Sequence, residues 1–137
     1  MERELDPEGQ LKLIEGAPQL NKAAGARERV VGVLSSAAVL AVLAAADMND
    51  TPTALGILAV VAAAAVMLSW YWFHLGATRR RPHTAVENAM RVFSIMMVGA
   101  PGSDILWHNP SPPADSVIAA SIPAVSFLVY LVLRWRR

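Results

Sequence analysis

The chain has 137 residues, of which 55 % are hydrophobic, and its mean hydropathy is +0.40. This apolar share exceeds the roughly 45–50 % of ordinary globular proteins, so the composition indicates a membrane protein, with a soluble all-α core as the alternative. The lack of cysteine excludes disulfides, thiolate metal sites and thiol nucleophiles. The formal net charge of +1 does not indicate nucleic-acid binding.

Residues 1–29 are predicted to form a polar cytoplasmic arm. Asp6 is suited to cap a helix, Pro7 to occupy its first position and Gly16 to end it. Leu11 and Ile14 lie three residues apart, on one face of that helix. The arm is therefore expected to hold a short amphipathic segment that rests on the cytoplasmic leaflet or docks onto a partner, or else to be a partly ordered tail.

Four apolar segments follow, at about residues 30–46, 54–75, 84–107 and 116–133. A helix needs roughly 20 apolar residues to cross a hydrocarbon core of about 30 Å. The first, second and fourth segments contain no Asp, Glu, Lys or Arg, and the third contains Glu87, Arg91 and Asp104. Hydropathy alone therefore does not decide whether the third segment crosses the membrane.

The positions of the basic residues indicate that the third segment does cross. Lys and Arg occur before the first segment, between the second and third, and after the fourth, while the other two connections contain none. Since basic residues are retained in the cytoplasm, this pattern predicts four crossings with both termini cytoplasmic. The predicted fold is an all-α membrane four-helix bundle; in the alternative, the third segment lies on the membrane surface and the C-terminus is external.

The third segment begins with a helix-capping pattern and carries a polar stripe. Thr84 and Glu87 have the T-x-x-E spacing of a capping box, so a helix is expected to begin at Thr84. Glu87, Arg91 and Ser94 then share one face. Three interpretations of this stripe stay open, since ionisable groups inside membranes are often functional: an ion pair facing the other helices, a proton or ion relay, or a contact to a partner subunit.

Pro101 and Gly102 are predicted to break or kink this helix near its outer end. The favoured interpretation is a helix that ends early, followed by a loop with Asp104 near the headgroups. The alternative is a broken helix that forms a binding site, as in some transporters.

Aromatic residues gather near the expected ends of the segments. Amphipathic rings prefer the membrane–water interface, so we expect interfacial anchors rather than a stacking platform for a ligand. The expected anchors are Trp70, Tyr71, Trp72, Trp107 and Trp135.

The three histidines do not predict a metal site. His74 and His83 are expected on the inner side of the membrane and His108 at the outer end, so they are not expected to converge on one ion. No catalytic residues, cofactor or metal are therefore predicted, and we expect a protein that is not an enzyme.

Small residues four apart, such as Gly32 with Ser36 and Ala120 with Ala124, favour close helix packing. We therefore expect an accessory or structural subunit of a larger membrane complex, in contact with lipids and with other subunits or copies of itself, and not with nucleic acid. Ten of the twelve basic residues are Arg, which suggests a bacterial inner membrane. The alternative is a self-assembling pore or small transporter, holin-like or exporter-like in layout, that uses the polar stripe.

Overall fold

The computed structural model describes residues 24–49, 51–76, 82–107, 109 and 111–136. These residues form helices α2 (Ala26–Met48), α3 (Thr53–Gly76), α4 (Ala85–Met97), α5 (Gly99–Leu106) and α6 (Pro113–Trp135), and no strand occurs among them. The predicted all-α class is therefore confirmed. The amphipathic segment expected in the N-terminal arm lies outside the described residues.

Three of the helices can cross a membrane by length and composition. Each of α2, α3 and α6 contains 18 residues with a mean hydropathy of 2.1 to 2.2, within a helical stretch of 23 residues. At 1.5 Å per residue such a stretch extends about 34 Å, slightly more than a hydrocarbon core. The segments predicted at 30–46, 54–75 and 116–133 lie inside these helices, so the membrane class is supported.

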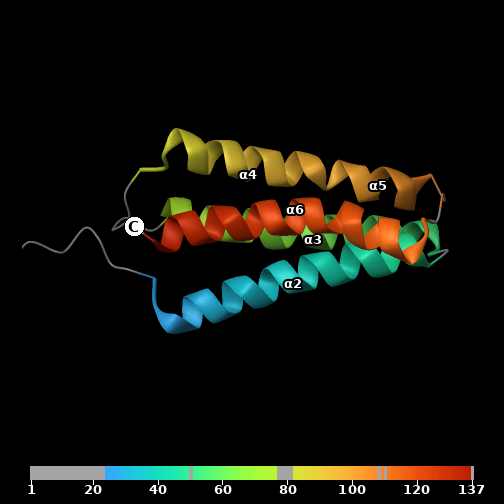
Figure 1. Cartoon of the computed structure of the whole chain (residues 1–137), viewed down its shortest axis with the longest axis horizontal. Helices are drawn as coiled ribbons and strands as arrows, with labels where there is room; N and C mark the ends of the chain where they lie inside the picture. Colours follow the sequence, from blue (N-terminus) through green and yellow to red (C-terminus); the bar gives the residue numbers. More distant parts are fainter. Residues whose placement is uncertain (1–23, 50, 77–81, 108, 110, 137) are drawn as a thin grey trace, which may run out of the picture.

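The fourth apolar segment is divided between α4, with 13 residues, and α5, with 8. The two short helices follow one another along nearly one line and run beside α6 (Figure 1). α4 ends at Met97, where the carbonyl would need an N–H from Pro101, which proline lacks. The interruption therefore falls at Val98, one turn before Pro101, and both Pro101 and Gly102 are buried inside α5.

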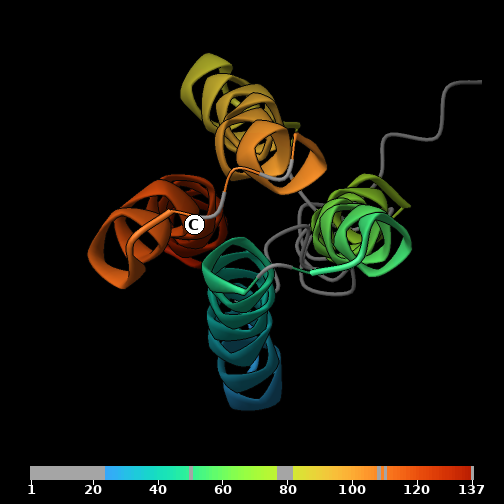
Figure 2. The ribbon, with the colours of Figure 1, turned by 90° about the vertical axis from the view of Figure 1, so that its right-hand side faces the viewer.

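Viewed along their axes, α2, α3, α6 and the α4–α5 pair surround a common interior (Figure 2). α6 packs most extensively, against α2 on one side and α4 on the other. α3 packs against α2 and α5 but makes few contacts with α4. α3 and α4 are therefore the neighbouring helices that are least closely joined.

The α2–α6 contact is close because small residues line it. Gly32 lies directly against the indole of Trp135, so an added Cβ would overlap that ring. One turn further on, the Ser36 hydroxyl donates a hydrogen bond of 2.8 Å to the Ala124 carbonyl. Small side chains permit such backbone approach, which drives helix association where water contributes little.

Candidate functional site

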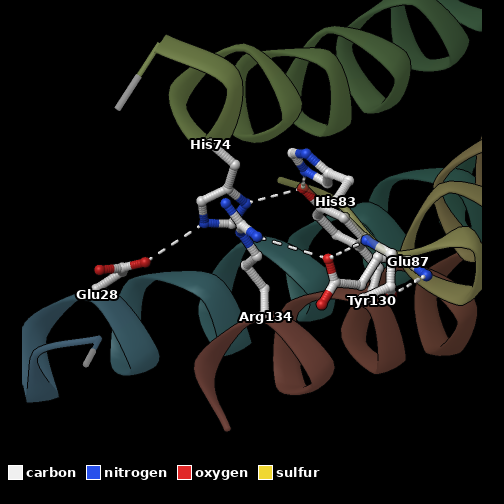
Figure 3. Close-up of polar contacts among 7 residues, drawn as sticks. Glu28, His74, His83, Glu87, Tyr130 and Arg134 are labelled. Atoms are coloured by element: carbon white, nitrogen blue, oxygen red, sulfur yellow. Dashed lines mark hydrogen bonds and ion pairs between the residues drawn. The ribbon is translucent and has the colours of Figure 1, made fainter. Parts of the chain in front are cut away.

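Polar side chains from four segments meet at the end of the helices where α2 and α4 begin and α6 ends (Figures 1 and 3). α2 contributes an acid from its first turn, α3 a histidine from its last turn, and the start of α4 a histidine and an acid. α6 contributes a tyrosine and an arginine from its last turns. We call this group the polar end cluster; it consists of Glu28, His74, His83, Glu87, Tyr130 and Arg134.

Tyr130 lies at the centre of this cluster and is fully buried. Its hydroxyl is 3.0 Å from Nδ1 of His74 and 3.1 Å from Nε2 of His83. Figure 3 shows both contacts as dashed lines. The His83 and Tyr130 rings are parallel within 2°. A single hydroxyl thus joins α6 to α3 and to the segment that leads into α4.

The hydrogen bonds that run from His83 through Tyr130 and His74 to Glu28 can all be donated in the same direction. Nε2 of His74 is 3.4 Å from a carboxylate oxygen of Glu28, so an Nε2–H tautomer donates to that acid. Nδ1 of His74 then accepts from the Tyr130 hydroxyl, whose oxygen accepts from Nε2–H of His83. In this arrangement each of the three hydrogen bonds is donated towards the partly exposed carboxylate of Glu28.

Glu87 closes the other side of the cluster. Its carboxylate accepts from the Thr84 backbone N–H at 3.1 Å, while the Thr84 hydroxyl accepts from the Glu87 N–H at 3.3 Å. This is the capping box that the sequence predicted. The same carboxylate oxygen is 3.5 Å from Nη1 of Arg134, and both side chains are almost fully buried. Glu87 therefore begins α4 and also binds it to α6.

Ser94 continues the internal contacts about two turns further along α4. Its hydroxyl donates to the Arg91 carbonyl at 2.9 Å and is 2.5 Å from the Tyr71 hydroxyl. Since the Ser94 proton is used, Tyr71 donates to Ser94. The Tyr71 ring also meets the Tyr130 ring edge to face at 4.9 Å. Ser94 thus ties α4 to α3.

The predicted polar stripe is therefore divided between two environments. Glu87 and Ser94 are buried and bonded to other helices. Arg91 is half-buried and lines a groove between α3 and α4. An ion pair between Glu87 and Arg91, which would fit one of the three interpretations of the stripe, is not formed in the described part of the chain; Glu87 is paired with Arg134 instead.

The charges around His83 change its protonation. Burial lowers the pKa of His83, and the nearby positive charges of Arg134 and Arg91 lower it further. Glu87 acts in the opposite direction with a smaller effect. Neutral His83 is therefore favoured, which suits the hydrogen bond to Tyr130.

The aromatic residues expected at the membrane interfaces lie in different places. Trp72 and Trp107 are 80 % and 84 % exposed, as interfacial anchors require. Trp70 is half-buried, and its indole N–H donates to the Ser35 hydroxyl at 3.0 Å.

Tyr71 and Trp135 face other helices instead. They are 4 % and 7 % exposed, and they pack against Phe127 and Gly32 respectively. Their contacts are those of core residues, since an anchor at the headgroups would leave its ring uncovered. Sequence position alone placed them near a helix end but could not say which face they occupy.

Two central residues of the cluster, Tyr130 and Arg134, were not among the predicted site residues. The signal available in the sequence was weak: they are four residues apart on one helix face, close to an end that also receives His74 and His83. Among the described residues, no three His, Asp or Glu side chains form a group able to hold a metal. His108, expected at the outer end, lies outside those residues.

No family model, curated protein or solved structure matches this chain. Function is therefore inferred from the contacts described above. Through these hydrogen bonds and ion pairs the polar end cluster holds the helices together. Its side chains can also exchange protons.

Proposed function

We propose that the chain is a small, non-enzymatic subunit of a larger complex in a bacterial inner membrane. In this proposal it forms a four-span bundle, with α4 and α5 together making the third crossing and both termini in the cytoplasm. From residue 85 to residue 106 the pair would extend about 33 Å, enough for one crossing. The basic residues near the start of α2 and the end of α6 support this orientation.

The polar side chains bind one another inside the bundle, which supports a structural role. Glu87 binds Arg134, Ser94 binds Tyr71, and His74 and His83 share Tyr130. Each of these contacts joins one helix or its leading segment to another. A polar residue that lined a water path would instead face an opening, so the contacts favour a subunit over a pore.

The observation that carries the proposal is the outward face of α3. Only 17 % of its most apolar stretch is buried by the rest of the chain, against 33 % in α2 and 44 % in α6. The face opposite the core consists of exposed apolar residues at helical spacing, among them Ala54, Leu58, Val61 and Ala65. Two alanines on this face allow another helix to approach closely. We infer that a helix of a partner subunit packs here.

The proposal is tested by purifying the full chain from its host membrane in mild detergent and quantifying the accompanying proteins. We expect other membrane proteins in fixed stoichiometry with this chain. Ala65→Phe places a large side chain on the outward face of α3 and should release them. Ala41→Phe is the matched control, because Ala41 is also exposed and apolar but lies on α2.

A different result would contradict the proposal. Recovery of this chain alone, as a homo-oligomer that makes liposomes leak, would favour the pore. Equal retention of the accompanying proteins by both variants would remove α3 as the contact surface.

A further inference from the structure

A groove of about 470 Å³ lies between α3 and α4, the two neighbouring helices that contact each other least. Leu68 and Trp72 of α3 line one side, and Val92 and Met96 of α4 line the other. The lining is almost entirely apolar, apart from the half-buried side chain of Arg91. The groove therefore combines a hydrocarbon surface with one positive charge.

Among the residues that the structure describes, none neutralises the charge of Arg91. Within the part of the chain that the structure describes, its guanidinium forms no ion pair or hydrogen bond. The nearest acid along α4, Glu87, is already bound to Arg134 and to the Thr84 backbone. A cation between apolar walls at the edge of a membrane is costly unless an anion or water meets it.

The groove also lies at a suitable depth for a lipid headgroup. Arg91 is six residues after the start of α4, about 9 Å along the axis. Helical side chains lean towards the N-terminus, so the long Arg91 side chain is directed to the end that carries the polar end cluster. Trp72, 80 % exposed, borders the groove near that end, as expected at a headgroup boundary.

We propose that this groove binds an acidic phospholipid of the membrane. The phosphate is bound by Arg91, and an acyl chain lies along the apolar surface formed by Leu68, Val92 and Met96. A guanidinium presents paired N–H donors that match two phosphate oxygens. Basic pockets between membrane helices on the cytoplasmic side are known to select anionic headgroups in this way. The groove begins one turn beyond Ala65 on α3, because Leu68 and Trp72 continue the face of that helix that carries Ala65.

The experiment uses the full chain in nanodiscs that contain equal amounts of phosphatidylglycerol and phosphatidylcholine. After transfer to mild detergent, native mass spectrometry counts the lipids retained. We expect phosphatidylglycerol to be retained over phosphatidylcholine, and Arg91→Gln to reduce that retention about tenfold, as the loss of a charge-assisted contact implies. Arg136→Gln, an exposed arginine outside the groove, is the control and should retain phosphatidylglycerol as the parent chain does.

A second variant tests the groove without removing the charge. Val92 is 52 % exposed, so Val92→Trp should fill the groove while the chain still folds. We expect it to lose phosphatidylglycerol at an unchanged melting temperature. Unchanged lipid retention in either Arg91→Gln or Val92→Trp would overturn the proposal. So would a change from oligomer to monomer in Val92→Trp, since a second copy of the chain would then be the occupant.

Discussion

Tyr130 is the residue on which the polar end cluster depends most. Tyr130→Phe keeps the ring but leaves His74 and His83 without their shared partner. We expect the free energy of unfolding to fall by about 1–2 kcal/mol, because two hydrogen bonds are lost and one of the histidines is fully buried. Unfolding by titration with a denaturing detergent measures this loss.

Tyr71→Phe is the matched control for this substitution. It removes one hydroxyl contact, to Ser94, which keeps its bond to the Arg91 carbonyl. The loss should therefore be smaller than for Tyr130→Phe. Equal or larger destabilisation by Tyr71→Phe would show that Tyr130 is not the centre of the cluster.

His83 gives the protein a pH dependence with a defined sign. Because burial, Arg134 and Arg91 lower the pKa of folded His83, the unfolded chain takes up this proton at a higher pH than the folded one. The stabilising contribution is fully present above the ordinary histidine pKa of about 6.5 and is lost as the pH falls from there towards the folded pKa. His83→Gln removes this contribution.

We therefore expect the stability of the parent chain to fall more between about pH 7.5 and about pH 5.5 than that of His83→Gln. Melting temperatures of both proteins, measured across this range in the same detergent, provide the comparison. Parallel curves would mean that the environment of His83 does not favour its neutral form.

At the level of single residues, the sequence predicted contacts between residues that are close together along the chain. The capping box of Thr84 and Glu87 follows from a three-residue spacing and is present. The partner of Glu87 could not be predicted in this way, because Arg134 belongs to another helix. Which faces of α4 and α6 meet is decided by packing of the whole chain. The same holds for the convergence of His74 and His83 on Tyr130.

Among the helices, the α2–α6 pair offers the sharpest test of packing. Gly32→Ala places a methyl group against the indole of Trp135, so the two helices must separate or the ring must move. Such overpacking costs about 1–3 kcal/mol, which thermal or detergent unfolding would detect. Gly99→Ala is the matched control, because a Cβ at that position meets nothing within 4 Å.

The control is expected to be neutral or slightly stabilising, since alanine favours a helix more than glycine does. A Gly32→Ala variant as stable as Gly99→Ala would contradict the close α2–α6 contact. Combination with Trp135→Leu should recover part of the loss, because the smaller side chain leaves space for the new methyl group.

The α4–α5 interruption shows how far an element can be predicted. Proline chemistry indicated a break near Pro101, and a break is present, but it lies at Val98. The reason is that proline withdraws its hydrogen bond from the carbonyl four residues earlier, at Met97. After that one interruption the chain returns to a helix that includes Pro101 and Gly102, where tertiary contacts bury both residues.

For the molecule as a whole, composition and charge-free length were enough to predict the helical membrane class, since α2, α3 and α6 are long and apolar. They could not predict that α3 would be the least buried of these three helices, because its burial depends on where the α4–α5 pair packs. The groove at Arg91 and the outward face of α3 both result from that asymmetry.

In the proposed topology α4 and α5 cross the membrane together, which would place the polar end cluster and Arg91 on the cytoplasmic side. The chain has no cysteine, so single substitutions report the side of each connection. Asn49→Cys, Pro82→Cys, Ser111→Cys and Arg136→Cys would be labelled with a membrane-impermeant maleimide in intact cells and in inverted vesicles. We predict that positions 49 and 111 react from outside and positions 82 and 136 from the cytoplasm. If position 111 reacts together with 82, and 136 together with 49, the third crossing does not exist.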